Sequence, residues 1–336
     1  MKLIIQIPCY NEAKTLKIAL DDLPRSIEGV DEIEVLIIDD GCTDETAQVA
    51  RDWGVDYIVK QRQNKGLAKG FMAGLDACLK NGADIIVNTD ADNQYCGADI
   101  EKLVRPIIER RSHIVIGARP IEETEHFSPL KKKLQHLGSW VVRKASKTDI
   151  PDAPSGFRAF SREAALRMSV INEYTYTLET IVQAGRSKID IMSVPIKTNP
   201  ELRKSRLFSS MWGYVRRSML TILRAILVYK PLLFFLTLGA GFSGLGGVLF
   251  IRYLILFGFG KGHGHTQSLI FASTLLIIGF VSIVAGLLGD LFSANRKLLE
   301  ESRYYARKKA FDMAAGKDPE SYEDIEYVKK SKKNKE

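Results

Sequence analysis

Two long uncharged segments dominate the second half of the chain. Residues 232–251 contain no charged side chain, and after Arg252 the apolar run resumes as far as Gly260. A second uncharged run covers residues 268–289. About 20 apolar residues in a helix are enough to cross a bilayer core of roughly 30 Å. Two buried core helices are the alternative, but core helices rarely lack a polar face over such a length. The pattern therefore favours two membrane spans.

The basic residues gather beside these two segments. Between positions 203 and 230 there are seven Lys or Arg and no Asp or Glu, and "NRKLLEESRYYARKK" follows the second run. The connection between the runs, "KGHGHTQ", holds a single Lys. The positive-inside rule then predicts an integral protein of the cell membrane with both termini in the cytoplasm. Anionic lipid is a better partner for these basic residues than nucleic acid.

Strand-like and helix-like segments alternate through the first 120 residues. The strand-like runs are rich in Ile, Leu and Val, as in "LIIQI", "IEVLIID", "DIIV" and "HIVIGAR". Continuous apolar strands joined by helices predict an α/β domain with a parallel sheet that is covered on both faces. In such sheets the ligand binds at the carboxyl ends of the strands.

Polar clusters follow three of these strands, at residues 8–12, 39–42 and 90–94. Because the carboxyl ends of parallel strands meet at one edge, we expect the clusters to form one polar site. Asp90, Asp92 and Gln94 offer hard oxygen ligands at alternate positions, which suits Mg²⁺ or Mn²⁺. The alternative is a loop whose aspartates cap the next helix. The preceding strand and the two other clusters favour the metal.

Five segments taken together resemble a known family. "IPCYNE", "IIDDGCTDET", "NKGLAKGF", "DADNQY" and "SGFRAFSREA", in this order, resemble the family-2 inverting glycosyltransferases of GT-A fold. The two C-terminal runs make the chain similar to the dolichyl- and polyprenyl-phosphate branch, over about residues 1–290. The resemblance implies a Rossmann-like, mostly parallel sheet in the catalytic domain. Independently of the resemblance, the amphipathic segment "SSMWGYVRRSMLTILRAILVY" predicts a helix that lies in the membrane interface before the two predicted transmembrane helices.

The resemblance implies a site for a nucleotide sugar, linked to UDP or GDP, at the first two polar clusters. Tyr10 either packs or covers a base or ribose edge. Asp40 either caps the helix that starts near Thr43 or accepts an N–H of uracil or guanine. The predicted nucleotide-sugar-binding residues are Pro8, Tyr10, Asn11, Glu12, Asp40, Gly66 and Asp90.

The same resemblance implies the metal ligands and the catalytic residues. Asp152 lies near the sugar, where it either orients the sugar or acts as a base. Arg119 follows the fifth strand and faces phosphate, and Arg158 closes the Ser-Gly-Phe-Arg segment. The predicted metal ligands are Asp90, Asp92 and Gln94, and the predicted catalytic residues are Asp152, Arg119 and Arg158.

The resemblance also implies residues that contact the phosphate of the lipid acceptor, and most of them are basic. The segment "PELRKSRLF" stands where the polyprenyl-phosphate branch often has Arg…Gly-x-Ser-Lys, but it lacks the glycine. Near a membrane, a run of lysines at 131–133 would contact a lipid phosphate; a solvated face is its alternative. The predicted acceptor-phosphate residues are Arg119, Lys132, Lys133, Arg203, Ser205 and Arg206.

Four regions follow from this interpretation: a cytosolic GT-A domain at 1–207, a juxtamembrane amphipathic helix at 208–230, a transmembrane hairpin at 231–291 and a charged cytosolic tail at 292–336. The predicted reaction moves one sugar from a nucleotide sugar to undecaprenyl or dolichyl phosphate with inversion. A processive polysaccharide synthase is an alternative, although the chain has no Gln-x-x-Arg-Trp. A non-catalytic, membrane-anchored nucleotide-sugar sensor is another. The sequence is compatible with a homo-oligomer.

Overall fold

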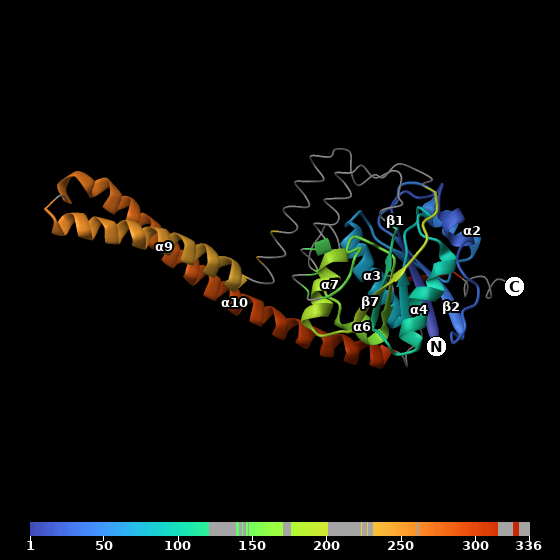
Figure 1. Cartoon of the computed structure of the whole chain (residues 1–336). Coiled ribbons are helices and arrows are strands. Elements are labelled where there is room, and N and C mark those ends of the chain that lie inside the picture. Colours follow the sequence, from blue (N-terminus) through green and yellow to red (C-terminus); the bar gives the residue numbers. More distant parts are fainter. Residues whose placement is uncertain are drawn as a thin grey trace. The chain divides into compact units, whose positions relative to one another are not determined.

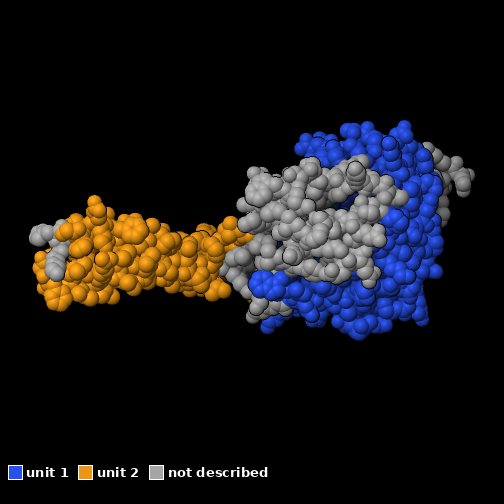
Figure 2. Space-filling view, turned by 45° about the horizontal axis from the view of Figure 1, so that its top comes forward, with its two compact units in different colours: residues 1–215, 301–336 blue, residues 216–300 orange. Residues whose placement is uncertain are grey.

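The computed structural model describes residues 1–120, 148–170, 176–200, 231–260, 262–314 and 325–328. It also describes isolated positions between 139 and 146 and at 223 and 227. The chain divides into two compact units (Figure 2). Unit 1 comprises residues 1–215 and 301–336, and unit 2 comprises residues 216–300.

Unit 1 is built on an eight-stranded sheet in the order β7-β5-β6-β4-β1-β2-β3-β8 (Figure 1). The strands are β1 (Lys2–Cys9), β2 (Glu32–Asp39), β3 (Tyr57–Lys60), β4 (Ile85–Asn88), β5 (Ile114–Ala118), β6 (Arg158–Ser161), β7 (Ile191–Pro195) and β8 (Ile325–Tyr327). The central pairs β1–β2, β1–β4 and β2–β3 are parallel, as is β5–β7. The prediction of a mostly parallel sheet is confirmed.

Two strands run against this direction. β6 pairs antiparallel with β4 and β5, and β8 pairs antiparallel with β3. Since β6 is reversed, its first residue lies beside the last residue of β4, in the pair Asn88↔Arg158. The segment before β6 therefore reaches the same sheet edge as the carboxyl ends of the parallel strands.

Helices cover both faces of the sheet. The helices between β1 and β7 are α1 (Leu16–Asp21), α2 (Thr46–Trp53), α3 (Leu67–Lys80), α4 (Ile100–Ile108), α6 (Arg162–Arg167) and α7 (Thr177–Arg186), with a 3₁₀ turn η1 (Gly97–Asp99). On one face Leu3, Ile5 and Ile7 join a core with residues of α1 and α4. On the other face α3 packs on β1 and β2. Burial on both faces explains why these strands are continuous apolar runs.

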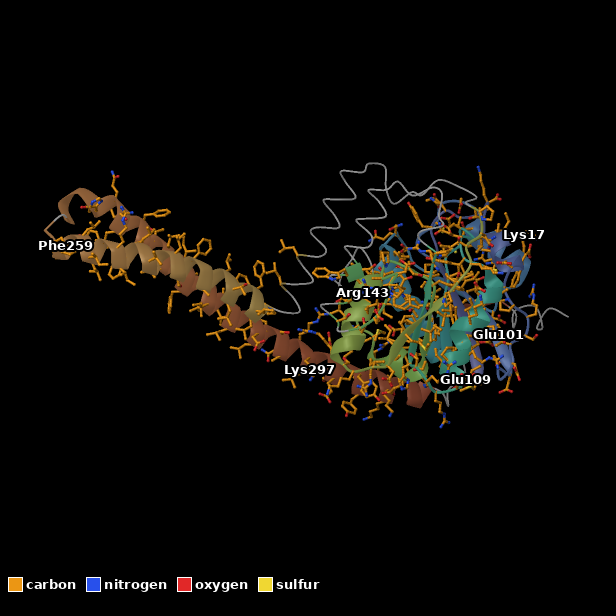
Figure 3. The ribbon with its side chains drawn as sticks, in the orientation of Figure 1. Lys17, Glu101, Glu109, Arg143, Phe259 and Lys297 are labelled. Atoms are coloured by element: carbon orange, nitrogen blue, oxygen red, sulfur yellow. The ribbon has the colours of Figure 1, made fainter. Side chains whose placement is uncertain are left out.

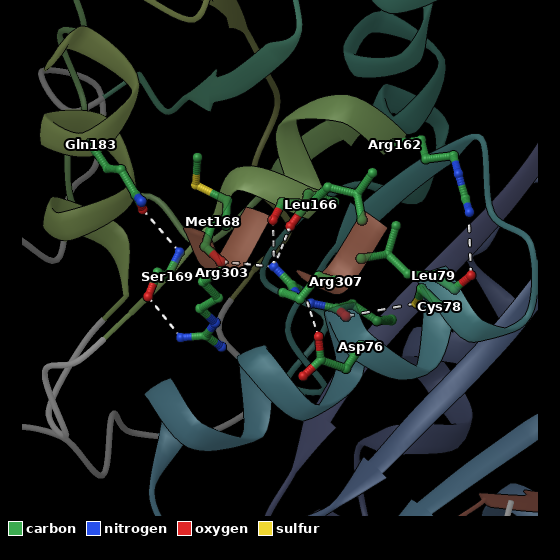
Figure 4. Close-up of polar contacts among 12 residues, drawn as sticks. Asp76, Cys78, Leu79, Arg162, Leu166, Met168, Ser169, Gln183, Arg303 and Arg307 are labelled. Atoms are coloured by element: carbon green, nitrogen blue, oxygen red, sulfur yellow. Dashed lines mark hydrogen bonds and ion pairs between the residues drawn. The ribbon is translucent and has the colours of Figure 1, made fainter. Parts of the chain in front are cut away.

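The helix that contains the second apolar run, α10 (Thr266–Ala314), continues well beyond that run. Its last part belongs to unit 1, where Arg307 is buried against α6 (Figure 4). The Arg307 guanidinium donates to the carbonyl oxygens of Ala165, Leu166 and Met168 at 2.8–3.0 Å and also contacts Asp76. These carbonyls close the end of α6, where a helix leaves acceptors without intrahelical partners.

The residues after α10 return to the sheet. β8 extends the edge beside β3, and Arg51 forms a two-pronged ion pair with Glu326 at 2.6 and 2.8 Å. Val328 is part of the hydrophobic core. Within the region predicted as a charged tail, 292–336, residues 292–314 are therefore helical, and residues 325–328 belong to the sheet and core of unit 1. The sequence of this segment alone does not reveal these partners, because they lie between 139 and 275 positions earlier in the chain.

Unit 2 contains the helical hairpin of α9 (Pro231–Gly258) and the first part of α10, joined through the 3₁₀ turn η3 (Gly262–His265). Both helices are long and apolar enough to cross a membrane. Figure 3 shows apolar side chains pointing outward along the pair. A Cβ added to Gly279 would lie 2.2 Å from Ser243 Oγ, so the helices approach too closely for a larger residue there. The predicted amphipathic helix at 208–230 lies outside the described residues, apart from positions 223 and 227.

Candidate active site

The polar clusters predicted from the sequence meet at one edge of the sheet in unit 1. The loops after β1, β2, β3 and β4 leave from the carboxyl ends of parallel strands. The segment before the reversed strand β6 approaches the same edge through the pairing of Arg158 with Asn88. Two segments of this edge are named here: the β4 loop (residues 89–96) and the Asp152 loop (residues 148–157).

The loops after β1 and β2 are joined by hydrogen bonds. Asn11, which has a positive φ of 56°, accepts from the backbone N–H of Thr43 at 2.8 Å. The backbone N–H of Glu12 donates to Thr46 Oγ1 at 2.8 Å, and the buried Glu12 carboxylate accepts from Thr15 at 2.9 Å. Tyr10, which immediately precedes Asn11, is 44% exposed. Asn11 and Glu12 thus brace the two loops, while Tyr10 presents its ring at the surface beside them.

Asp40 joins the loops after β2 and β3. Its two oxygens accept from the backbone N–H groups of Lys65 and Gly66 at 2.8 and 3.0 Å. Gly66 has a φ of 87° and immediately precedes α3, a backbone conformation that glycine adopts without strain. Burial raises the pKa of Asp40 above its ordinary value despite these hydrogen bonds. The structure therefore brings together Asp40 and Gly66, both predicted for the nucleotide site.

The β4 loop carries the predicted metal ligands. Asp90, Asp92 and Gln94 are all partly exposed, and Asp92 Oδ1 accepts from the backbone N–H of Gln94 at 3.1 Å. Asn93, between them, has a φ of 56°, which produces a tight turn. Within the described ranges there is no cluster of three or more His, Cys, Asp or Glu side chains that would hold a metal by itself. Two carboxylates and an amide oxygen suit a divalent cation that completes its shell with substrate phosphates.

Asp152 is held by Arg119. The Asp152 carboxylate accepts from the Arg119 backbone N–H at 3.2 Å, from Nε at 2.8 Å and from Nη2 at 3.0 Å. Only 1% of the Asp152 side chain and 14% of the Arg119 side chain are exposed. Burial acts to lower the pKa of Arg119, but the neighbouring Tyr95 and Asp152 outweigh it and the pKa is raised. The pair is a fixed, charged element of the site.

Arg158 has no exposed surface. Its guanidinium donates to the carbonyl oxygens of Ala153 and Ser155 at 2.7 and 2.8 Å, and to Thr177 and Thr180 on α7. Burial lowers the pKa of Arg158 to about 10. The side chain is enclosed by protein groups and lies behind the Asp152 loop. Its donors are directed at the protein backbone and at Thr180. The catalytic role predicted for Arg158 stays a prediction.

The segment after β7 returns to the β4 loop, which the sequence did not reveal. The Asn199 backbone N–H donates to the Gln94 carbonyl at 2.9 Å, and Thr198 forms a β-bridge with Tyr95. The buried Asp99 accepts from the Lys197 backbone N–H at 2.5 Å. Lys132, Lys133, Arg203, Ser205 and Arg206, all predicted for the acceptor phosphate, lie outside the described residues.

Residues 4–168 match the family described as glycosyl transferase family 2. A UDP-N-acetylglucosamine–dolichyl-phosphate N-acetylglucosaminyltransferase of Methanococcus voltae is 31% identical over 217 residues. That alignment covers 57% of this chain and 83% of the relative. The chain belongs to glycosyl transferase family 2. The five sequence segments that suggested this family are thereby correctly interpreted.

Further comparisons agree with this family and its fold. An undecaprenyl-phosphate mannosyltransferase of Micrococcus luteus is 26% identical over 225 residues, covering 63% of this chain and 90% of that protein. Glucosyl-3-phosphoglycerate synthase of Mycobacterium tuberculosis, solved with Mn²⁺, UDP and glucosyl-3-phosphoglycerate, superposes with a TM-score of 0.52 at 17% identity. That superposition covers 66% of this chain and 79% of the synthase chain. At this identity the likeness shows the fold, and it confirms the predicted GT-A type.

Proposed function

We propose that this family 2 glycosyltransferase moves one sugar from a nucleotide sugar to a polyprenyl phosphate, with inversion, at a membrane surface. The observation that carries the proposal is the meeting of three charged elements at one sheet edge: the acidic β4 loop, the Asp40 cluster and the Arg119–Asp152 pair. The names of the two relatives above, each a transferase with a lipid phosphate acceptor, support the substrate class.

Asp90, Asp92 and Gln94 would hold a divalent cation, Mg²⁺ or Mn²⁺, together with the donor diphosphate. Such a cation supplies charge neutralisation for the leaving diphosphate. The partly exposed side chains of the β4 loop support this assignment, because a cation that binds through substrate phosphates needs access from solvent.

The nucleoside would bind over the loops after β1, β2 and β3. Tyr10 offers an exposed ring at this place, beside the loops that Asn11 and Glu12 brace. A carboxylate has about four lone-pair sites. The two backbone hydrogen bonds to Asp40 therefore leave it capacity to accept an N–H from a base. Uracil and guanine both present such a group.

Arg119 and Asp152 would orient the sugar and the acceptor phosphate. The three hydrogen bonds from Arg119 favour a positioning role for Asp152 over that of a base. The acceptor phosphate is an anion near neutral pH and needs little help from a base, so alignment and charge stabilisation carry the reaction. No described residue accepts from Arg119 Nη1, which leaves these hydrogens for a phosphate oxygen.

The residues of this chain that would contact the acceptor phosphate come directly after the segment that is hydrogen-bonded to the β4 loop. Arg203, Ser205 and Arg206 come four to seven positions after Asn199, whose backbone N–H is bonded to Gln94. Covalent geometry alone keeps seven residues within roughly 25 Å. A lipid phosphate contacted by these residues would therefore lie within range of the donor diphosphate.

The catalytic unit and the residues after the hairpin would share the cytoplasm. β8 pairs with β3 in one sheet, so the chain must lie in the same compartment before α9 and after α10. Two spans between them satisfy this requirement. The excess of Lys and Arg outside the connection between the spans supports the cytoplasm as that compartment.

A donor screen tests the function. The purified full chain, a short polyprenyl phosphate, Mn²⁺ or Mg²⁺ and a panel of UDP- and GDP-sugars are incubated, and the lipids are analysed by mass spectrometry. We expect one donor to give a lipid phosphate that carries a single sugar. Transfer of several sugars would contradict the proposal, as would the absence of any glycosylated lipid across the panel.

Cysteine labelling tests the topology. An impermeant thiol reagent added to intact cells should label a cysteine placed at Gly262 and miss one placed at Lys309. The unmodified chain is the control, because its four cysteines all belong to unit 1 and should stay unlabelled. Labelling of Lys309→Cys but not Gly262→Cys would reverse the proposed orientation.

A further inference from the structure

Both backbone polar groups of Gly156, in the Asp152 loop, form hydrogen bonds that reach β4 or the β4 loop. Its N–H donates to the hydroxyl of Tyr95 at 3.0 Å. Its carbonyl oxygen accepts from Asn88 Nδ2 at 3.0 Å and from the Tyr176 hydroxyl at 3.2 Å. Asn88 ends β4 and Tyr95 lies in the β4 loop, so the hydrogen bonds of these two residues connect β4 and its acidic loop to the Asp152 loop.

The partners of Gly156 are themselves fixed. Tyr95 is buried, and its ring stacks on Phe157 with centroids 4.9 Å apart. Asn88 is fully buried and accepts from Gln6 Nε2 at 2.9 Å, which directs its amide nitrogen toward Gly156. The Tyr176 ring stacks on Phe71 at 3.9 Å. Buried polar networks of this kind are rigid when every member has a partner.

Gly156 also lies directly against the Asp90 carboxylate. A Cβ added at this position would be 3.2 and 3.3 Å from the two Asp90 oxygens and 3.1 Å from the Tyr176 hydroxyl. The backbone φ of Gly156 is not in the left-handed region, so an alanine would be limited by space and not by conformation. The absence of a side chain at 156 thus lets the Asp90 carboxylate approach the backbone closely, and a Cβ there would force the carboxylate to shift.

We propose that the clasp formed by Asn88, Tyr95 and Gly156 is a positioning device that fixes the Asp90 carboxylate and thereby sets the affinity of the site for its divalent cation. This inference rests on the proposed function, since it takes Asp90 as a metal ligand. The clasp also fixes the spacing between the β4 loop and the Asp152 loop, because Asp152 lies four residues before Gly156 in the same loop. Substitution of a residue that orients a metal ligand without contacting the metal typically changes metal affinity 10- to 100-fold.

Two variants test the clasp in the full-length protein. Binding of Mn²⁺ in the presence of UDP is measured from the electron paramagnetic resonance signal of the free ion, so the readout does not depend on turnover. Gly156→Ala should raise the Mn²⁺ dissociation constant about 10-fold or more, by displacing Asp90. Tyr95→Phe removes one hydroxyl and keeps the stacked ring, and it should raise the constant roughly 2- to 10-fold.

Matched controls separate positioning from general destabilisation. Gly70→Ala adds a Cβ that would meet only Ile38, at an ordinary 3.7 Å. Tyr57→Phe removes another buried tyrosine hydroxyl, which donates to Glu34 at 2.8 Å. Tyr57 is the first residue of β3 and therefore lies at the opposite edge of the sheet. Both controls should leave Mn²⁺ affinity within about twofold of the parent, whatever they do to the melting temperature.

The outcomes are distinct. Unchanged Mn²⁺ affinity in Gly156→Ala, or an equal change in the controls, overturns the clasp. If Gly156→Ala does not fold, Tyr95→Phe decides by the same measure. Absence of any Mn²⁺ binding by the parent chain also overturns the inference. If the variants behave as expected but the donor screen yields no glycosylated lipid phosphate, the clasp stands and the proposed acceptor fails.

Discussion

Two acidic strand ends lie at the same edge of the sheet, but their environments differ. Asp39 and Asp40, at the end of β2, are 2% and 5% exposed and accept backbone hydrogen bonds from Cys42, Lys65 and Gly66. The aspartates of the β4 loop are partly exposed. A position at the carboxyl edge explains why both pairs are near a ligand site. The two pairs differ in burial. The buried pair at the end of β2 organises loops, whereas the partly exposed pair of the β4 loop is accessible to a cation.

The largest effect is expected at the β4 loop. Asp92→Asn should lower sugar transfer by at least about 100-fold, on the scale of losing a main charge stabiliser. The fold should survive, because the loop is polar and partly exposed. A chelator should abolish transfer by the parent chain. Full activity in the variant, with or without chelator, would remove the distinction between the two acidic pairs.

A second prediction concerns Arg119, which follows β5 and is paired with the buried Asp152. Arg119→Ala leaves the buried Asp152 carboxylate without its ion-pair partner, and it should lower the free energy of unfolding by about 3 kcal/mol. Transfer to lipid should fall more than donor affinity measured by calorimetry. Arg105→Ala is the control, because Arg105 makes surface ion pairs with Glu28 and Glu101. A parallel fall in donor affinity would assign Arg119 to the donor diphosphate.

The smallest effect is expected at the buried pair. Asp40→Asn replaces one accepting oxygen by an amide nitrogen that faces a backbone N–H, so one of two buried hydrogen bonds is lost. We expect a loss of about 1–2 kcal/mol in the free energy of unfolding. Thermal and denaturant unfolding would check it. No change in stability would mean that Asp40 does not organise the loop at residues 65–66.

The strand ends were predictable because their signal is local. Runs such as "DIIVNTDAD" show an apolar strand followed at once by carboxylates, and the parallel sheet brings such ends together. The burial of Arg158 and the acceptors of its guanidinium were not predictable from a local signal. An arginine after Ser-Gly-Phe suggests a cation for substrate, but its acceptors come from Ala153, Ser155 and two residues of α7. Only the packing shows that this side chain is buried.

The edge of the sheet shows the same limit. β8 has three residues in a charged stretch, and its pairing with β3 and the contact between Glu326 and Arg51 join segments 275 positions apart. No local pattern indicates such a partner. By contrast, the two apolar helices were predictable from length and composition alone, because uncharged runs of this length can form helices long enough to cross a membrane. The Asn88–Gly156–Tyr95 contacts also depend on tertiary packing, although the polar Asn88 at the end of an apolar strand is a visible signal.

We propose that the buried pair at the end of β2 organises loops, whereas the aspartates of the β4 loop bind the cation. Metal-dependent donor binding tests this difference most directly. Calorimetry of UDP binding to the full chain would be measured with and without Mn²⁺ for the parent, Asp92→Asn and Asp40→Asn. We predict that Mn²⁺ tightens UDP binding at least about tenfold in the parent and in Asp40→Asn, and has no effect in Asp92→Asn. Asp40→Asn should bind UDP more weakly than the parent under both conditions. An equal response to Mn²⁺ in Asp92→Asn and in the parent would contradict the claim.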